Sequence, residues 1–301
     1  MRVRECVCCV QLYVAIFFFA IVALRRSTKP EVSVRSQCGR VYAYATIENA
    51  HRCKEYEELP LIIPDCQTKQ TIVPRILHVV GRSVDKFALL SLAATNPTFN
   101  INALNDSSAV SYIADKCGRD AVEAYKCLKS NAFRGDLFRY CALLADGGIY
   151  LDQDIMPLKP LDELISPCSV ATVGHDFPLD GIPAKQTKIL SAAPQSDLMR
   201  CAVHLVVENV RKRLKPENPL ELSATRAMQH CYAKYPHDVA ITYIDSREAV
   251  WPFTGMRRGI DLIAFERAST KHFKPDPDDY SAQTTRGDIY ESSCTLSQVM
   301  F

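Results

Sequence analysis

The 301-residue sequence lacks a strong charge bias, an internal repeat and a low-complexity tract. Its net charge of +2 gives no support for a nucleic-acid partner, because proteins that bind nucleic acid carry strongly basic surfaces. It also lacks a glycine-rich phosphate loop, which disfavours a phosphotransferase or hydrolase built on such a loop. An apolar fraction of 48% and a charged fraction of 23% are typical of a globular protein, and a chain of this length can bury a sizeable core.

The cysteines lack the spacing of a zinc site. There are 13, and the ten from Cys38 to Cys294 contain no C-x-x-C pair. An even number permits disulfides in an oxidising compartment, so we expect one to three of them, with the pairing left open. A free buried thiol is the alternative for Cys141 and Cys201, which fall on predicted apolar helix faces.

An uncharged stretch of 19 residues runs from Cys6 to Leu24 and is flanked by arginines. As a helix it is long enough to span a hydrocarbon core of ~30 Å. No small-residue cleavage site precedes Arg25, so an uncleaved signal anchor is favoured over a cleaved signal peptide or a buried core helix. Positive charge on both flanks does not decide the orientation. The short basic tail favours a single-pass type II protein with a lumenal C-terminal domain.

The chain is expected to divide into a cytosolic tail at 1–5, the transmembrane anchor at 6–24, a stem at 25–70, a folded domain at 71–270 and a C-terminal tail at 271–301. The stem mixes charge, cysteine and proline with little periodicity, and the chain beyond Phe265 is polar with little expected order. Asn105-Asp106-Ser107 is an N-glycosylation acceptor sequence, which has meaning only in a lumenal domain. Pro97 excludes Asn96-Pro97-Thr98.

Short apolar runs alternate with helical patterns over most of the remaining chain. The predicted strands are 76–80, 99–104, 149–155, 169–173 and 239–244, and the predicted helices are 85–94, 107–116, 119–129, 132–145, 196–213 and 220–234. The helix over 132–145 is the clearest, because Phe133, Leu137, Tyr140, Cys141 and Leu144 form one apolar stripe. Such alternation predicts an α/β fold with Rossmann-like connections.

Two aspartates end the predicted strand over 149–155. Side chains alternate along a strand, so Tyr150, Asp152 and Asp154 are expected to face one side. Ligand sites in open α/β sheets lie beyond the carboxyl ends of the strands. Two neighbouring carboxylates repel each other unless a cation or a proton intervenes, and hard divalent cations prefer oxygen ligands. The pattern predicts a metal site at Asp152 and Asp154, although two aspartates at this spacing are by themselves common on solvated surfaces.

Asp136 and Arg139 lie three residues apart on the predicted helix over 132–145 and border its apolar stripe. From there they can reach the same pocket as the strand carboxylates. Asp136 can accept hydrogen bonds from ligand hydroxyls, and Arg139 can donate to phosphate or hydroxyl oxygens. The alternative is a structural ion pair on a solvated helix face.

The full pattern is more specific than two aspartates. It reads Arg-x-Asp-x-x-Arg-Tyr over 134–140, Gly-Gly-x-Tyr-x-Asp-x-Asp over 147–154 and Pro-Leu-x-Pro-Leu over 157–161. This pattern resembles the glycosyltransferases with a DXD sugar-binding region, a group that includes α-1,6-mannosyltransferases, α-1,4-galactosyltransferases and capsular polysaccharide enzymes. It is more distantly similar to clostridial glucosylating toxins. The resemblance covers roughly residues 73 to 235.

The resemblance implies a GT-A fold, in which a mixed Rossmann-like sheet is flanked by helices, for the domain at 71–270. It implies retaining transfer of a hexose from a nucleotide-sugar donor to a glycan, glycolipid or glycoprotein acceptor, with Mn2+ or Mg2+ as cofactor. For localisation it implies the membrane of the Golgi or another secretory compartment, with the catalytic domain in the lumen.

The resemblance also implies roles for individual residues. Asp154 matches the direct metal ligand, and Asp152 matches a carboxylate that contacts ribose, sugar and the metal shell. Arg139 and Asp136 match contacts to the donor sugar, so Asp152, Asp154 and Arg139 are the expected catalytic residues. The further matches are Tyr150 near the donor, Arg134 as a supporting basic residue, His78 and Val79 at the nucleotide base, and His272 as a third metal ligand.

Some positions depart from the pattern of the family. Val80-Gly81 stands where the family usually has an aromatic residue, Thr187 stands where it often has asparagine, and Ser223-Ala224-Thr225 replaces Thr-Gly-Pro. These departures leave a second reading open, in which the protein is a catalytically inactive relative that binds a sugar or a nucleotide. Asp176 and Asp180 are candidates for contact with the acceptor, but a polar loop explains them equally well.

Overall fold

A computed structural model of the chain describes residues 72–81, 86–163, 165, 169–179, 182–236, 239–243, 245–250, 253–258, 261–267 and 280–294. All of them belong to the compact unit Leu61–Phe301. The predicted tail, anchor and stem lie outside the described residues, and so does His272. Within the described part, no helix combines the length and the apolar character needed to cross a membrane. The predicted domain boundaries stay predictions.

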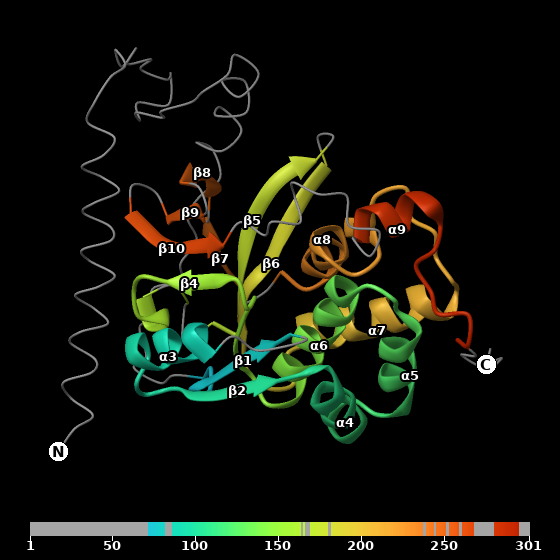
Figure 1. The fold of residues 1–301 in the computed structure, drawn as a ribbon, viewed down its shortest axis with the longest axis horizontal. Helices are drawn as coiled ribbons and strands as arrows, with labels where there is room; N and C mark the ends of the chain where they lie inside the picture. Colours follow the sequence, from blue (N-terminus) through green and yellow to red (C-terminus); the bar gives the residue numbers. More distant parts are fainter. Residues whose placement is uncertain are drawn as a thin grey trace, which may run out of the picture. The chain divides into compact units, whose positions relative to one another are not determined.

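A mixed six-stranded sheet forms the centre of the fold, in the order β2-β1-β3-β6-β5-β7 (Figure 1). Its strands are β1 (Ile76–Val80), β2 (Asn100–Leu104), β3 (Gly148–Leu151), β5 (Ala171–Leu179), β6 (Ile182–Ala192) and β7 (Val239–Tyr243). β1 pairs in parallel with β2 and β3, and β5 pairs in parallel with β7. β6 runs antiparallel to β3 and β5 and joins the two parallel groups. The predicted mixed α/β sheet is therefore confirmed.

A second, antiparallel sheet was not expected from the sequence. It consists of β4 (Ile155–Pro157), β10 (Asp261–Arg267), β9 (Phe253–Arg258) and β8 (Asp245–Val250), in that order. The predicted continuous strand over 149–155 is wrong, because β3 ends at Leu151 and β4 begins at Ile155 in the other sheet. Its two halves have different partners: Leu151 pairs with Ile189 of β6, whereas Ile155 pairs with Glu266 of β10.

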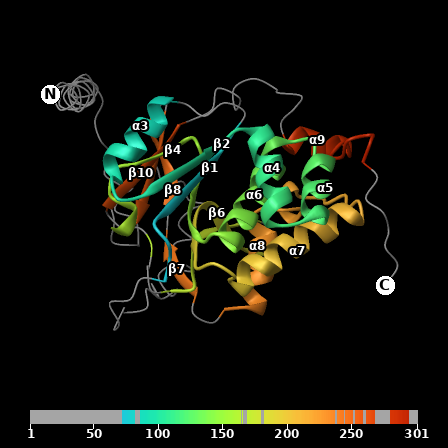
Figure 2. The ribbon, with the colours of Figure 1, turned by 90° about the horizontal axis from the view of Figure 1, so that it is seen from below.

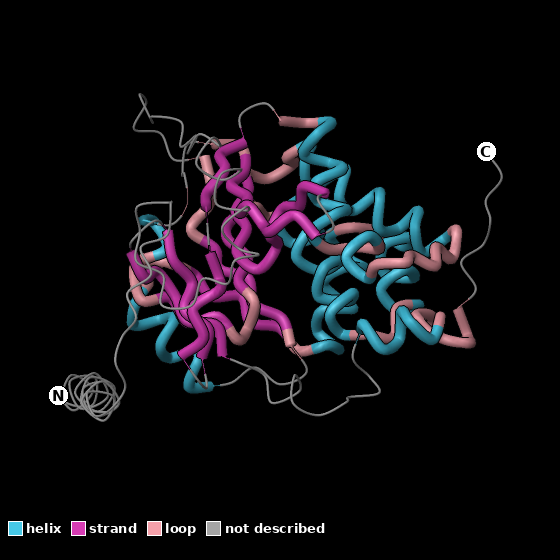
Figure 3. The backbone as a smooth tube through the Cα atoms, turned by 90° about the horizontal axis from the view of Figure 1, so that it is seen from above, coloured by secondary structure: helices cyan, strands magenta, loops and turns pink. Residues whose placement is uncertain are grey.

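Helices cover both sides of the central sheet. They are α3 (Lys86–Thr95), α4 (Asp106–Lys116), α5 (Arg119–Cys127), α6 (Asn131–Ala145), α7 (Asp197–Arg211), α8 (Thr225–Lys234) and α9 (Tyr280–Arg286), with 3-10 turns at η1 (Leu161–Glu163) and η2 (Pro219–Glu221). α4 to α9 gather on one side, and α3 lies with β4 and β10 on the other (Figure 2, Figure 3). The predicted helices are confirmed to within a few residues, except that η2 and α8 replace one helix over 220–234.

Order also extends further toward the C-terminus than expected. β10 and α9 contradict the prediction of little order beyond Phe265. After α9, Glu291 N donates to Cys127 O at 2.8 Å, and Cys127 forms a disulfide with Cys294. Ile289 and Tyr290 of this segment are also buried in the main core. The polar composition of the segment hid its attachment, because these few apolar residues form no periodic pattern.

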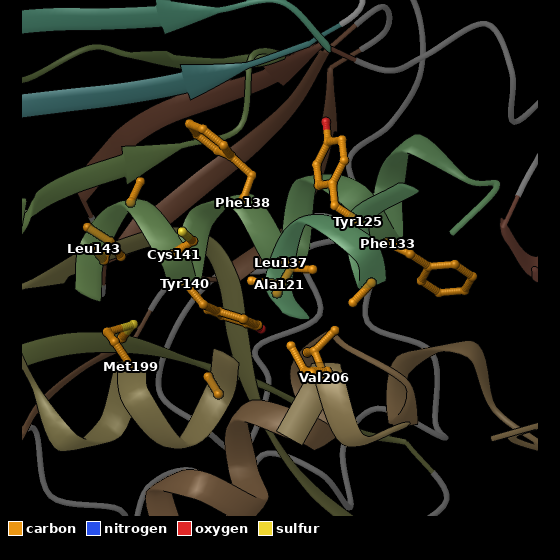
Figure 4. Packing of buried hydrophobic residues seen from close by; sticks show 14 of the residues in the cluster. Ala121, Tyr125, Phe133, Leu137, Phe138, Tyr140, Cys141, Leu143, Met199 and Val206 are labelled. Carbon is orange, nitrogen blue, oxygen red and sulfur yellow. The ribbon is translucent and has the colours of Figure 1, made fainter. Parts of the chain in front are cut away.

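α6 is the central helix of the larger core. The Ser130 side chain caps its start by accepting a hydrogen bond from Ala132 N at 3.2 Å. Leu137 and Tyr140 point toward α7, whereas Phe138 points toward the sheet (Figure 4). Burial therefore extends around most of the helix and not only along the predicted stripe. As a consequence, polar side chains at the edge of that stripe are also removed from water.

Three disulfides lie within the described residues: Cys117–Cys141, Cys127–Cys294 and Cys201–Cys231. The expectation of one to three disulfides is met by this part of the chain. The alternative of free buried thiols at Cys141 and Cys201 is wrong.

Removing the Cys127–Cys294 disulfide is expected to destabilise the domain more than removing Cys201–Cys231. The first disulfide joins cysteines 167 positions apart in the chain, and the second joins cysteines 30 positions apart. In the chain-entropy account a longer loop gives a larger gain, so replacing Cys127 and Cys294 together by alanine should cost about 2–5 kcal/mol. The difference between the two double variants should be about 1–2 kcal/mol. Urea unfolding measures both, and equal losses would contradict this account.

Candidate functional site

Asp152, Gln153 and Asp154 form the turn that joins β3 to β4 at the carboxyl end of β3. Asp152 N still donates to Lys188 O of β6 at 3.0 Å, and Ile155 N then donates to Asp152 O at 3.0 Å, which closes the turn. The prediction that Asp152 and Asp154 project from one face of a strand is therefore wrong. The two aspartates are carried by one tight turn and not by a strand. Both side chains are half-buried, while Gln153 between them is exposed.

The Arg139 guanidinium links this turn to α6 and β6. Its Nη2 lies 3.0 Å from Asp136 Oδ1 and 3.1 Å from Asp152 Oδ1. Its Nε donates to Gly135 O at 3.3 Å, and its Nη1 donates to Thr187 O. The Asp136 and Arg139 side chains are each only 6% exposed, which excludes the reading of this pair as an ion pair on a solvated helix face. One cation thus holds two carboxylates from different elements.

Tyr150 completes the fixation of Asp152. The Tyr150 hydroxyl donates to Asp152 Oδ1 at 2.9 Å, and the Arg139 guanidinium carbon lies 4.6 Å from the centre of the Tyr150 ring. Burial raises the pKa of Tyr150 well above its usual value, so the hydroxyl stays a donor at neutral pH. Asp152 Oδ1 therefore receives two donors, and Oδ2 has no hydrogen-bond partner among the described residues.

Asp136 is held from a second direction by the loop before α8. Ser223 Oγ donates to Asp136 Oδ2 at 2.6 Å, and Ser223 O accepts from the Tyr140 hydroxyl at 2.7 Å. Burial raises the pKa of Asp136 to about 6, and this outweighs Arg139 and Ser223, which both lower it. In the sequence, Ser223 and Thr187 are visible only as departures from the pattern of the family. Their contacts with Asp136 and Arg139 cannot be predicted locally, because each residue lies far along the chain from its partner on α6.

His78 is fully buried, and its ring is enclosed by β1, β2 and the loop before β3. Its Nε2 lies 2.9 Å from Gly147 O, and its Nδ1 lies 3.1 Å from the Asn102 amide. Nε2 therefore carries the proton and donates, while Nδ1 accepts. Burial lowers the pKa of His78, which keeps the ring neutral. These contacts tie strands together, and the expected contact of His78 and Val79 with a nucleotide base stays a prediction.

Arg134 lies apart from the Arg139 network. Its Nε donates to Leu128 O at 2.6 Å, and its Nη1 lies 3.1 Å from Asp106 Oδ2 at the start of α4. Arg139 follows Arg134 by five positions in α6, which places the two side chains about 140° apart around the helix. Of the remaining candidates, Asp176 lies in β5 with its backbone paired to Ala184, and Asp180 lies outside the described residues.

The end of β1 contacts the Asp152–Asp154 turn directly. Gly81 N donates to Leu104 O at 3.2 Å, and a Cβ added to Gly81 would overlap the side-chain amide of Gln153. The Gln153 side chain thus occupies the space above Gly81. The overlapped atoms are the end of a flexible, exposed side chain that can move aside, so this contact alone does not require glycine at position 81.

Comparisons with known proteins match this region. Residues 83–170, which include α6, β3 and the Asp152–Asp154 turn, match the family of glycosyltransferase sugar-binding regions containing a DXD motif. An initiation-specific α-1,6-mannosyltransferase of Candida albicans is 45% identical over 47 residues, or 16% of this chain and 12% of that protein. Its namesake in Saccharomyces cerevisiae is 32% identical over 69 residues, or 22% of this chain and 14% of that protein.

The matched segments thus span less than a fifth of the length of these relatives. Among solved structures, the PaToxG glycosyltransferase superposes with a TM-score of 0.43 at 18% identity, over 55% of this chain and 70% of that one. Residues 83–170 of this chain are similar to the glycosyltransferase sugar-binding regions of the DXD type.

Proposed function

We propose that this chain is a membrane-anchored GT-A glycosyltransferase that transfers a hexose from a nucleotide-sugar donor to a glycan, glycolipid or glycoprotein, with retention and with Mn2+ or Mg2+. The observation that carries the proposal is the buried network of Asp136, Arg139 and Asp152 at the carboxyl end of β3, inside the matched DXD region. Carboxyl ends of parallel strands are where ligands bind in α/β sheets, and β3 pairs in parallel with β1.

The residues present fit a hard divalent cation. Carboxylate oxygens are its preferred ligands, and Mg2+ commonly binds through one or two carboxylates together with substrate phosphates. Within the described residues no group of three or more His, Cys, Asp or Glu could hold a metal, so the further ligands would have to come from the donor or from His272. Asp152 and Asp154 would hold the ion, with His272 as the candidate third ligand. The bound ion would neutralise charge on the departing nucleoside diphosphate.

The network itself provides fixed positions for donor contacts. Arg139 uses its hydrogen-bond donors on Asp136, Asp152 and two backbone carbonyls, so its guanidinium cannot rotate freely. Among the described residues, Asp136 and Asp152 form ion pairs with Arg139 alone, so one of these two negative charges would be left for a metal ion to balance. Above about pH 6 Asp136 is mostly ionised, which maintains its ion pair with Arg139 and the hydrogen bond from Ser223. A sugar hydroxyl that reached this buried carboxylate would donate a further hydrogen bond to it.

The disulfides support a secretory location. Cys117–Cys141, Cys127–Cys294 and Cys201–Cys231 form and persist in oxidising compartments, where eukaryotic glycosyltransferases of this kind act. The uncharged stretch from Cys6 to Leu24 would anchor the chain with residues 71–270 in the lumen. The names of the mannosyltransferase relatives make mannose the first donor sugar to test.

A donor screen on the purified full chain tests the proposed function. Hydrolysis of a panel of nucleotide sugars is followed by release of the nucleoside diphosphate, with Mn2+, with Mg2+ and with a chelator. We expect release from one donor class, strongly dependent on the cation. Binding of a donor without turnover under all conditions favours the inactive relative instead, and turnover that is unaffected by the chelator contradicts the metal assignment.

Replacing Gly81 by alanine is expected to leave this donor hydrolysis within about threefold of the wild-type rate. The atoms that a new Cβ would overlap form the end of the Gln153 side chain, which is flexible and exposed and can move away. A substitution of this kind usually costs about 0.5 kcal/mol or less, which is under half a decade in rate at about 1.36 kcal/mol per decade. Steady-state release of the nucleoside diphosphate measures the effect. A tenfold loss that Gln153→Ala restores would show instead that Gln153 cannot move without the turn that carries Asp152 and Asp154.

A further inference from the structure

The chain holds a single N-glycosylation acceptor sequence, Asn105-Asp106-Ser107, because proline disqualifies Asn96-Pro97-Thr98. Asn105 lies between β2 and α4, is exposed to solvent and caps the N-terminus of α4. None of its contacts belongs to the network around Arg139. The acceptor sequence therefore has no part in the proposed transfer chemistry.

The contacts of Asn105 use one end of its amide. Oδ1 accepts from Ser108 N at 2.9 Å and from Ser107 Oγ at 2.8 Å, and the backbone oxygen accepts from Ala109 N at 2.9 Å. Nδ2 has no hydrogen-bond partner among the residues that the structure describes. Glycosylation joins the sugar to Nδ2 and leaves Oδ1 an amide oxygen, so the helix cap survives the modification.

The neighbouring side chains leave room for a bulky group. Asp106 turns its carboxylate toward the protein, where Oδ1 accepts from the Tyr125 hydroxyl at 2.6 Å and Oδ2 lies 3.1 Å from Arg134 Nη1. Ser107 and Ser108 are exposed. An oligosaccharide on the acceptor nitrogen therefore breaks none of the hydrogen bonds at the start of α4.

The excluded sequence at Asn96 provides a contrast. Asn96 is only 2% exposed, and its Nδ2 donates to Leu92 O at 3.2 Å while its Oδ1 accepts from Leu161 N at 2.7 Å. A glycan there would destroy buried hydrogen bonds. Proline thus disqualifies Asn96, where the fold has no room for a glycan, whereas the exposed Asn105 keeps a complete acceptor sequence.

We infer that Asn105 Nδ2 carries an N-linked oligosaccharide when the chain is made in a eukaryotic cell. In this step the Nδ2–C1 bond forms as the bond from C1 to the diphosphate oxygen of a lipid-linked oligosaccharide breaks. The lipid diphosphate leaves with the electron pair of that bond, and Nδ2 loses one proton. The inference rests on the lumenal location under "Proposed function" and not on the transferase activity.

The test uses the full chain with its own N-terminus, expressed in cultured eukaryotic cells. Gel mobility and the mass of the peptide containing Asn105 are compared before and after treatment with a peptide N-glycosidase. Wild type and Ser107→Thr should lose one glycan on treatment, whereas Asn105→Asp and Ser107→Ala should show no change. Aspartate caps a helix as well as asparagine does, so Asn105→Asp should keep the wild-type melting temperature and donor hydrolysis.

Wild-type chain without a glycan overturns the inference, and so does a mobility shift that persists in Asn105→Asp. A glycosylated chain that hydrolyses no donor would instead contradict the proposed function and leave the glycan assignment standing. The two proposals therefore fail in distinguishable ways.

Discussion

Replacing Asp154 by alanine is expected to lower metal-dependent donor hydrolysis by roughly a thousandfold or more, because a metal ion contributes several kcal/mol of charge stabilisation at about 1.36 kcal/mol per decade. Asp154 lies in the turn between β3 and β4 and is half-buried. Its removal should leave the domain folded, with a change of about 1 kcal/mol in the free energy of unfolding. Steady-state release of nucleoside diphosphate and urea unfolding measure the two effects.

Asp154→Asn and Asp115→Ala are the matched controls for this variant. Asparagine keeps the shape of the side chain and removes the charge, so Asp154→Asn should be nearly as slow as Asp154→Ala. The Asp115 side chain on α4 is 76% exposed and belongs to no part of the network, so Asp115→Ala should retain the wild-type rate. Wild-type activity in Asp154→Ala would refute the assignment of the metal to this turn.

Replacing Arg139 by methionine is expected to destabilise the domain by about 3–5 kcal/mol, the usual loss when one partner of a buried ion pair is removed. The change leaves the Asp136 carboxylate buried without its cation and releases Asp152 from α6. Methionine fills much of the space of the aliphatic part of the arginine side chain. The decrease in the free energy of unfolding therefore comes mainly from the lost charge and less from lost volume. The midpoint and slope of urea unfolding give the change in the free energy of unfolding.

A second substitution separates charge from packing in this experiment. Arg139→Met combined with Asp136→Asn removes the uncompensated carboxylate, and we expect it to recover part of the lost stability. The exposed pair of Arg119 and Glu123 on α5 serves as the comparison, since Arg119→Met should leave the unfolding midpoint unchanged. A loss for Arg139→Met as small as that for Arg119→Met would contradict the structural role of the network.

Local signals along the chain predicted most of the first half of the fold. β1 has the predicted bounds, because a short apolar run ended by Gly81 is a strong strand signal. α6 was found from its apolar stripe, and Ser130 adds a cap at its start. The second half was predicted less well. No strand was predicted from the sequence over β6, β8, β9 or β10. The order of the strands in the two sheets also depends on which strands pair, and single-strand patterns do not specify partners.

In the candidate site too, contacts between residues near in the chain could be predicted, whereas contacts between distant residues could not. Asp136, Arg139, Tyr150 and Asp152 are expected together, and the structure brings them together, because they lie on one helix and on the strand and turn that follow it. The turn at Asp152–Asp154 was read as strand because alternation continues across it and no glycine or proline marks it. Ser223 lies 87 residues from Asp136 in the chain, a separation over which no local pattern predicts a contact.

The central claim is that the Asp152–Asp154 turn binds a divalent cation together with the diphosphate of the donor. Binding of Mn2+ to the full chain, followed by electron paramagnetic resonance with and without a nucleoside diphosphate, tests it most directly. We expect one Mn2+ per chain, bound more tightly when the diphosphate is present, and loss of that ion in Asp154→Ala. Unchanged Mn2+ binding in a folded Asp154→Ala variant would contradict the account.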